Sequence, residues 1–495
     1  MPGITEPMLT YLFTLMHVLS DLVWLLAIVD IITIFVLIFM ERMDPRSFVA
    51  WLVIILIVPF IGVILYLFVG CTVYRRHAFT LKGYEDEKMA EQCKEEFDAI
   101  DADTDLEDPD IRRFARTIRN AGGWGYSANN SVELITEGNK KMEMLFADLE
   151  KAEKFILFQY YILRDDEIGN ELMRILTDKV EAGIPVYLLT DAFGNGKGPK
   201  DGIRRFRKAG GHFALFHVPV KLVFSPKKNH RNHRKIAVID GKVAYCGGYN
   251  IGKEYVHQGR FGYWRDASVR IEGGAIIPLS VRVMSDWNYA AKKDKIEDPT
   301  LFLTKDPYEH KGNIRVQTVS GGPDTFENNP VRTQYIMMTR EARKILYITT
   351  PYLSPDDMLT ENIKCAAMSG ADVRIIVPAV GDHIFVHWNT LNAANELMKF
   401  GVRIFLHQNG FDHAKTLICD DAFLSVGSAN MDDRSLRLNF ETNVMIYSKE
   451  LRNEMYEVFM HDLNYCTEYS CDEYESMPFK YKLKTKVSYL FRLIS

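Results

Sequence analysis

The chain has 495 residues, of which 47% are hydrophobic and 25% are charged, and its formal net charge is −5. This length and composition predict two or three domains that fold mostly in water, and the small net charge argues against a general nucleic-acid binder. The seven cysteines form no C-x-x-C pair, which favours free thiols in a reducing compartment over a disulfide framework or a zinc site.

Residues 1–75 are predicted to form a membrane hairpin of two transmembrane helices. Residues 22–40 and 48–70 are apolar runs, and about 20 apolar residues in a helix suffice to cross a bilayer. A cleaved signal peptide fits less well, because residues 1–40 contain no Lys or Arg. A re-entrant hairpin stays open as an alternative to a transmembrane one.

The basic residues that follow the hairpin indicate its orientation. Arg75, Arg76 and Lys82 come soon after the second apolar run, and positively charged residues near a membrane segment favour the cytoplasmic side. We therefore expect a multi-pass membrane protein with its main domain in the cytoplasm. Residues 76–125 are rich in Asp and Glu, which is typical of an acidic, solvated linker.

The region after residue 125 contains an internal repeat, which predicts two similar lobes, residues 126–310 and 311–477. In each copy a buried-strand pattern is followed by a helix pattern, a glycine and a second strand; these segments are 154–161, 169–182 and 185–191, then 344–352, 358–368 and 372–378. Such units indicate an α/β fold with mixed, mostly parallel sheets. Because ligands bind at the carboxyl ends of such strands, two facing lobes predict one shared cleft.

Both copies also carry the pattern H-x-K-x4-D-x6-G-[GS]-x-N. It comprises His233, Lys235, Asp240, Gly248 and Asn250 in the first copy, and His413, Lys415, Asp420, Ser428 and Asn430 in the second. Residues two apart on a strand share a face, so each His and its Lys would enter the same cleft. Lys suits phosphate oxygens, and Asn250, Asn430 and Ser428 would add hydrogen bonds to a substrate phosphate.

This set of residues suits chemistry on a phosphodiester. One imidazole can attack phosphorus while the other protonates the leaving alkoxide, and this requires neither a metal nor a cofactor. Asp266 lies 33 residues after His233, and Glu441 lies 28 residues after His413. Each carboxylate is therefore a candidate to orient a histidine through its second ring nitrogen. We group Asp240 and Asp420 with the catalytic set as part of the motif, although their position at the end of an apolar strand leads us to expect a structural role in the following turn.

The paired motifs resemble the HKD motifs of the phospholipase D superfamily. The N-terminal hairpin with Asp44-Pro-Arg46, the stretch from Asn250 to Tyr255 and the stretch from Asn430 to Ser435 are similar to those of bacterial cardiolipin synthases. The resemblance implies that a phosphatidyl group passes from one phosphatidylglycerol to a histidine and then to a second phosphatidylglycerol. It implies His233 as the nucleophile and His413 as the acid and base, although the near-symmetry leaves the reverse order open.

Two further features suit an anionic lipid. A basic cluster surrounds the first motif and comprises Lys227, Lys228, His230, Arg231 and Arg234. Residues 478–495 form a basic tail with interleaved apolar residues, which is typical of a segment at a membrane interface, and a solvated terminus is the alternative. The stretch around His383 and Trp388 departs from the family pattern, which indicates either a change in acceptor or ordinary packing.

Three functions remain open at this point. The first is a cardiolipin synthase. The second is another enzyme of the same chemistry: a phospholipase D hydrolase, a transferase with a different acceptor, or a phosphodiesterase for nucleic acid. The third is a non-catalytic membrane scaffold, which the presence of two complete His-Lys-Asn sets disfavours. We expect phosphatidylglycerol, anionic membrane lipid and the membrane itself as partners and no nucleic acid; the sequence predicts no oligomeric state.

Overall fold

The computed structural model describes residues 6–40, 45–67, 73–100, 108–216, 230–303, 312–325 and 328–490. The chain forms two compact units. The N-terminal unit comprises residues 1–81 with residues 220–229, and the α/β unit comprises residues 82–219 and 230–495.

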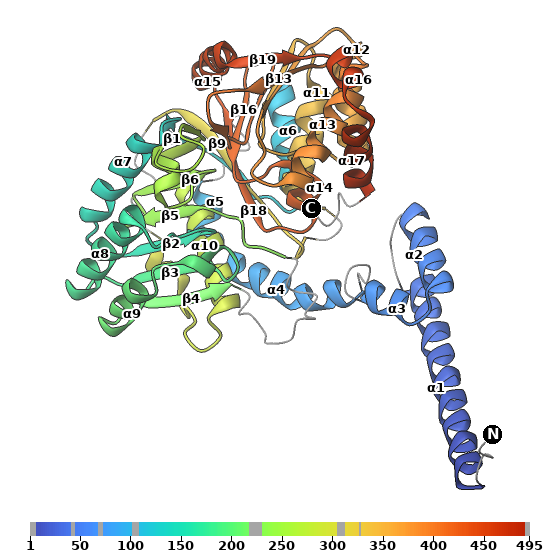
Figure 1. Ribbon diagram of the computed structural model, residues 1–495. Coiled ribbons are helices and arrows are strands. Elements are labelled where there is room, and N and C mark those ends of the chain that lie inside the picture. The colour runs from blue at the N-terminus through green and yellow to red at the C-terminus, as the bar shows by residue number, and fades with distance from the viewer. Residues whose placement is uncertain are drawn as a thin grey trace. The chain divides into compact units, whose positions relative to one another are not determined.

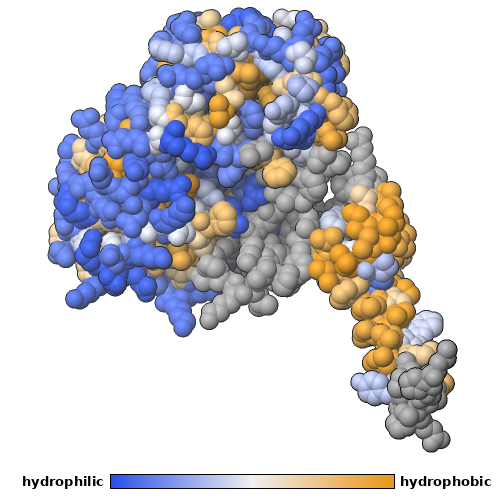
Figure 2. Space-filling model, viewed as in Figure 1, coloured by the Kyte–Doolittle hydropathy of each residue, from blue (hydrophilic) through white to orange (hydrophobic). Residues whose placement is uncertain are grey.

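The N-terminal unit is dominated by one long apolar helix, α1 (Glu6–Phe39). Its segment Phe13–Phe39 is long and apolar enough to cross a membrane, and within the described residues it is the one helix that is. Hydrophobic side chains cover most of its visible surface (Figure 2). Its composition therefore agrees with the first predicted membrane segment.

The second apolar run is broken, so the prediction of one continuous helix was wrong. It forms α2 (Pro45–Ile57) and α3 (Ile61–Leu65), with the break at Pro59. Proline has no N–H and clashes with the preceding turn, which interrupts a helix. Phe60 adopts a φ of 64° there, and its N–H donates to the Asp30 carboxylate at 3.2 Å. The acidic residue within the first run thus satisfies a backbone donor freed by the break.

The acidic linker is largely helical. It contains α4 (Val73–Gln92), α5 (Lys94–Ile100) and α6 (Pro109–Asn120). Lys82, expected from the sequence to be a charge beside the membrane, is instead fully buried. Its Nζ lies 2.7 Å from Asp86, 3.1 Å from Asp286 and 2.8 Å from Asp324, so it is neutralised inside the α/β unit and adds nothing to an orientation argument.

The α/β unit is built from two lobes. The first contains β1 (Tyr126–Ile135), α7 (Gly138–Glu150), β2 (Ile156–Tyr160), α8 (Glu167–Glu181), β3 (Val186–Asp191), α9 (Lys200–Lys208), β4 (His212–Phe216), β5 (Ile236–Ile239), β6 (Val243–Gly247), β7 (Trp264–Arg265), β8 (Ser268–Glu272) and α10 (Ile276–Ala290). The helices α7, α8 and α9 lie on the outer side of its strands (Figure 1).

The second lobe repeats this plan. It contains β9 (Ile314–Gly321), α11 (Pro330–Glu341), β10 (Ile345–Thr349), β11 (Leu353–Ser354), α12 (Asp357–Met368), β12 (Asp372–Pro378), α13 (Ile384–Met398), β13 (Arg403–His407), β14 (Phe411–Asp412), β15 (Thr416–Cys419), β16 (Phe423–Gly427), β17 (Met431–Asp432), α14 (Asp433–Arg437), β18 (Glu441–Tyr447), α15 (Lys449–Asp462), β19 (Cys466–Tyr469), α16 (Cys471–Ser476) and α17 (Phe479–Leu490). The predicted repeat of strand, helix and strand is therefore confirmed in both lobes.

The two lobes share one mixed sheet of 15 strands, joined where β1 of the first lobe pairs with β9 of the second. Only the pairs β2–β3, β3–β4, β10–β12 and β12–β13 are parallel in this sheet, and its other described pairs are antiparallel. The mixed α/β fold with two lobes is confirmed, but the expectation of mostly parallel pairing was wrong. In each lobe an antiparallel pair forms where the motif strand, β5 or β15, returns beside the first strand of its βαβ unit.

Candidate active site

His233 lies where the two lobes meet. Just before β5, its backbone N–H donates to the Phe440 carbonyl at 2.9 Å. Its imidazole Nδ1 lies 3.0 Å from the Glu441 carboxylate at the start of β18. Since a carboxylate only accepts, Nδ1 carries the proton, and Nε2 is left with its lone pair.

His413 of the second lobe is held in the same way by residues of the first lobe. The short strands β14 and β7 pair in parallel, and the His413 N–H donates to the Arg265 carbonyl at 2.7 Å. Its Nδ1 donates to Asp266 across 2.7 Å. Each lobe therefore supplies the carboxylate that orients the histidine of the other lobe, and neither His–carboxylate pair is complete within one lobe.

Lys235 and Lys415 are buried beside these histidines. Each Nζ donates to the backbone carbonyl of its own histidine, at 2.6 Å for Lys235. Burial lowers the pKa of Lys235 to about 7 and that of Lys415 to about 8, with Asp266 and Glu441 opposing the shift. An anion bound between them would favour the charged lysines, because an opposite charge stabilises the protonated form.

The histidine pKa values respond to both lobes at once. Burial lowers the pKa of His413 to about 4, and the nearby charge of Lys415 lowers it further. The pKa of His233 is also lowered, chiefly by burial, while Glu441 raises it. The charges of Lys415 and Lys235 each lower the pKa of the histidine in the opposite lobe. The two sets therefore form one electrostatic site with neutral imidazoles at pH 7.

Among the positions that define the motif, the two copies differ only at Gly248 and Ser428. Each of these residues lies against one of the two carboxylates that orient the histidines. A Cβ at Gly248 would lie 2.0 Å from the Asp266 carboxylate. Only glycine at this position therefore leaves room for the Asp266 side chain. In the second lobe the Ser428 hydroxyl donates to Glu441 at 2.5 Å. The contacts therefore make Ser428 a support for Glu441, not the phosphate ligand that the sequence analysis expected.

The two asparagines differ in how far their side chains are already engaged. Asn250 accepts from the Ile162 N–H at 3.1 Å and donates to the Tyr255 hydroxyl at 2.7 Å. Asn430 is buried, and its Oδ1 has no hydrogen-bond partner among the residues that the structure describes. An unpaired buried amide oxygen is costly and calls for a ligand or water, so Asn430 is the better candidate for substrate contact.

Asp240 and Asp420 do not contact the histidines. The Asp240 carboxylate accepts from the N–H groups of Glu153, Lys154 and Phe155 at 2.7–3.0 Å. Asp420 does the same with residues 343–345. Both residues have positive φ values, 56° and 46°, which Asp tolerates in tight turns. Their grouping with catalytic residues is not supported, and the turn-holding alternative agrees with these contacts.

Sequence reasoning missed Tyr161, whose ring meets the His233 ring edge-on at 4.9 Å between centroids. Lys235 Nζ lies 5.4 Å from the same ring. The position of Tyr161 at the carboxyl end of β2 was the available signal, since ligand sites in such sheets lie there.

The predicted basic cluster does not act as one surface. Lys227 and Lys228 lie outside the described residues. His230 is buried, with Nδ1 2.9 Å from the Leu438 carbonyl. Arg231 lies 4.3 Å from the centroid of the Phe193 ring.

Arg234 is fully buried and joins the lobes, because it donates to Asp286 at 2.5 Å and to the Thr442 hydroxyl at 3.0 Å.

Comparison with known proteins places these features in a family. The family model described as "Cardiolipin synthase, PLD-like domain" matches residues 145–260 and 335–463, and "Phospholipase_D-nuclease N-terminal" matches residues 22–70. A curated cardiolipin synthase of Listeria monocytogenes serotype 4b is 38% identical over 96% of this chain and 99% of its own. One of Staphylococcus aureus is 37% identical over 94% of both chains.

A solved structure supports the fold independently. The crystal structure of phosphatidylserine synthase from Haemophilus influenzae covers 77% of this chain and all of its own, with a TM-score of 0.60. Its sequence identity is 16%, so this likeness concerns the fold alone.

Proposed function

Since this chain belongs to the cardiolipin synthase family of the phospholipase D superfamily, we propose that it joins two phosphatidylglycerol molecules through a covalent phosphohistidine. Membership of this family shows that the chain is a phosphatidyltransferase that makes cardiolipin. The order of the steps and the residue roles are our proposal. The observation that carries them is the reciprocal pairing of His233 with Glu441 and of His413 with Asp266.

In the first step, Nε2 of His233 attacks the phosphorus of the donor lipid. The bond from phosphorus to the glycerol headgroup oxygen breaks. His413 takes up a proton from solvent when the bound anionic phosphodiester favours the charged ring, and it gives this proton to the leaving oxygen, so glycerol leaves. Glu441 supports the attack because it holds the Nδ1–H and stabilises the positive charge that develops on the ring. Lys235 and Lys415 supply positive charge for the phosphoryl oxygens, and the Oδ1 of Asn430, unpaired among the described residues, accepts from a headgroup hydroxyl.

In the second step, the now neutral His413 removes a proton from a headgroup hydroxyl of the second phosphatidylglycerol. That oxygen attacks phosphorus, the bond from phosphorus to His233 breaks, and cardiolipin forms. Attack by water in place of the lipid hydroxyl would give phosphatidic acid, so exclusion of water from the site decides between transfer and hydrolysis.

The test uses full-length protein purified in detergent with phosphatidylglycerol and EDTA, and lipid products are identified by mass spectrometry. We expect cardiolipin and glycerol from the unaltered protein and neither from His233→Ala or His413→Ala. Quenching during turnover in denaturant at neutral to mildly alkaline pH, which preserves the acid-labile bond from phosphorus to nitrogen, should leave a phosphatidyl group on a peptide that contains His233. Label on a His413 peptide would reverse the two roles, and phosphatidic acid without cardiolipin would exclude the transferase.

Membrane association follows from the family and the apolar N-terminal helix. For the finer topology we propose two passes, the second made by α2 and α3 together, with the α/β unit in the cytoplasm. Broken helices are tolerated in membranes when a neighbour satisfies the freed backbone groups, and Asp30 does this for Phe60.

A protease-accessible epitope at the N-terminus of the full chain tests this topology. In intact spheroplasts the epitope should be protected, because two passes return the chain to the side from which it started. Digestion from outside the cell would instead indicate a single pass with α2 and α3 re-entrant.

A further inference from the structure

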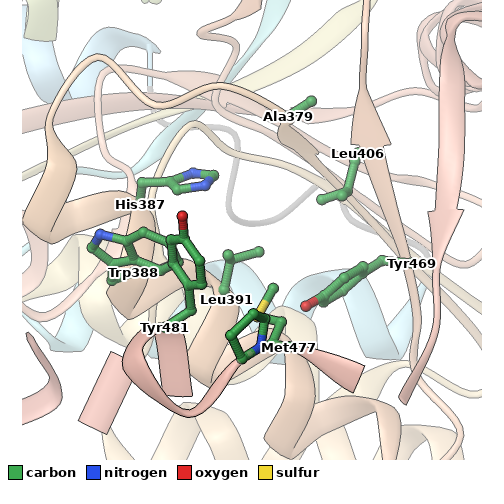
Figure 3. Close-up of a pocket in the computed structure, with 9 residues that line it drawn as sticks. Ala379, His387, Trp388, Leu391, Leu406, Tyr469, Met477 and Tyr481 are labelled. Carbon is green, nitrogen blue, oxygen red and sulfur yellow. The ribbon is translucent and has the colours of Figure 1, made fainter. Parts of the chain in front are cut away.

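A pocket lies in the second lobe, lined by side chains from α13, β13, β19 and α17 (Figure 3). Its volume is about 390 Å³, within the usual range of about 300–1,000 Å³ for small-molecule sites. Its lining is mostly apolar: Ala379, Trp388, Leu391, Leu406, Met477 and Pro478. None of these residues belongs to the two His-Lys-Asn sets or their carboxylates.

The pocket also presents one unsatisfied polar group. Tyr469 is buried at the end of β19, and within the described part of the chain its hydroxyl has no hydrogen-bond partner. In Figure 3 that hydroxyl points toward the centre of the pocket. A buried donor without a partner is costly, so a ligand with a carbonyl oxygen at this position would satisfy it.

The edge of the pocket carries positive charge. Lys484 Nζ lies 5.4 Å from the centre of the Trp388 ring and 5.1 Å from that of Tyr481, both of which line the pocket. Lys480 and Lys486 on the same helix are exposed. A ligand with an apolar tail and an anionic head would match this arrangement, because the tail enters the cavity and the head meets Lys484.

Exposed apolar side chains continue outward from the pocket. Val380 and Phe479 directly follow the lining residues Ala379 and Pro478, and they are 61% and 78% exposed. Phe385 at the start of α13 and Leu483 on α17 are also exposed. Aromatic and aliphatic side chains interleaved with lysines are typical of a surface that lies in the headgroup region of an anionic membrane.

We propose that this pocket binds one acyl chain of an anionic glycerophospholipid of the bilayer, with an ester carbonyl on Tyr469 and the phosphate on Lys484. The site is separate from the catalytic histidines and gives the α/β unit its own contact with the membrane, in addition to α1. It also assigns Trp388 a function, as the wall that contacts both the acyl chain and Lys484.

Photochemical cross-linking tests the site. The full-length protein is placed in nanodiscs that contain phosphatidylglycerol with a diazirine on an acyl chain, and labelled peptides are mapped after irradiation. We expect label on residues 379–391 or 469–481 as well as on α1, which serves as the internal standard. Absence of label from both pocket segments, with α1 labelled, would overturn the proposal.

Three variants of the pocket and one control variant sharpen this result. Leu391→Trp fills the cavity and should abolish pocket labelling, whereas Leu301→Trp, at an exposed position elsewhere, should not. Tyr469→Phe removes the donor at almost constant volume and should weaken the labelling. Lys484→Gln should reduce the preference for phosphatidylglycerol over an equally tagged phosphatidylcholine about fivefold. Equal labelling by both lipids in the unaltered protein would refute the anionic headgroup.

The catalytic variant His233→Ala separates this proposal from the catalytic one. It should label as well as the unaltered protein while forming no cardiolipin. If pocket labelling were lost together with turnover in that variant, the label would report the active site and not a second lipid site.

Discussion

The Glu441 carboxylate of the second lobe lies 3.0 Å from Nδ1 of His233 in the first. Asp266 of the first lobe lies 2.7 Å from Nδ1 of His413 in the second. Because each pair of histidine and carboxylate joins residues of both lobes, the active site forms only when the two lobes pack together. A change that separates the lobes would disorient both histidines together.

Glu441→Gln tests this pairing between the lobes. The amide still fills the space but cannot stabilise the imidazolium, so we expect kcat to fall by about 10²–10⁴-fold. Asp266→Asn should show a loss of the same order. Cardiolipin formation measured at saturating lipid, with thermal unfolding as the control for folding, checks both. Activity within about threefold of the unaltered enzyme would show that the carboxylates have no chemical role.

Gly248→Ser places in the first motif the serine that the second motif carries at the same position. The added Cβ would meet the Asp266 carboxylate at 2.0 Å, which must move away from His413, so we expect activity to be nearly lost. The reciprocal variant Ser428→Gly removes the hydroxyl that donates to Glu441 and accepts from the Thr442 N–H. It creates no clash and should cost about tenfold or less, equivalent to roughly 1.4 kcal/mol. Similar losses in the two variants would contradict this asymmetry.

Asp240→Asn should affect stability and not chemistry. Asparagine tolerates the positive φ but loses the charge that accepts three backbone N–H groups, so we expect about 2 kcal/mol of destabilisation. The folded fraction should retain its kcat. A lowered melting temperature with unchanged kcat per folded molecule confirms this, whereas lost kcat in a fully folded variant places Asp240 in the catalytic set.

Anion binding should weaken as pH rises. The pKa values of Lys235 and Lys415 are about 7 and about 8, so both lysines lose their protons between pH 6.5 and 9. Sulfate keeps its charge over this range, and we expect its dissociation constant to rise at least about tenfold. Thermal stabilisation by sulfate at several pH values measures this, and an unchanged constant would contradict the lowered lysine pKa values.

Without a bound anion, the free energy of unfolding should increase as pH rises. The unfolded chain keeps both lysines protonated up to their ordinary pKa of 10.5. The folded state has already released those protons above pH 8. Because the unfolded state binds more protons in this interval, these two groups make the free energy of unfolding increase with pH. Lys235→Met should remove part of that increase.

Lys82→Met should destabilise the α/β unit. Lys82 forms ion pairs with three buried carboxylates from α4, α10 and the turn after β9, and removing one partner of a buried charge set costs about 3–5 kcal/mol. The double variant Lys82→Met/Asp324→Asn should recover part of the loss, since it removes an uncompensated negative charge. A melting temperature unchanged in the single variant would show that this network is not structural.

The sequence by itself determined the repeat, the two α/β lobes and the residues that carry the chemistry. It could do so because spacing within each motif is local: His233 and Lys235 are fixed two positions apart on one extended segment. It also predicted Asp266 and Glu441 as partners, since each follows a motif at a similar distance.

Only the tertiary structure decided which histidine each carboxylate serves. Those contacts are formed across residues far apart in the chain, where β14 meets β7 and residue 232 meets residue 440, and no local period encodes them. The same holds for Lys82 and Arg234, which read as surface charge in the sequence but lie buried among carboxylates. Burial and partner choice depend on the packing of distant segments, whereas residue type and spacing are already present in the chain.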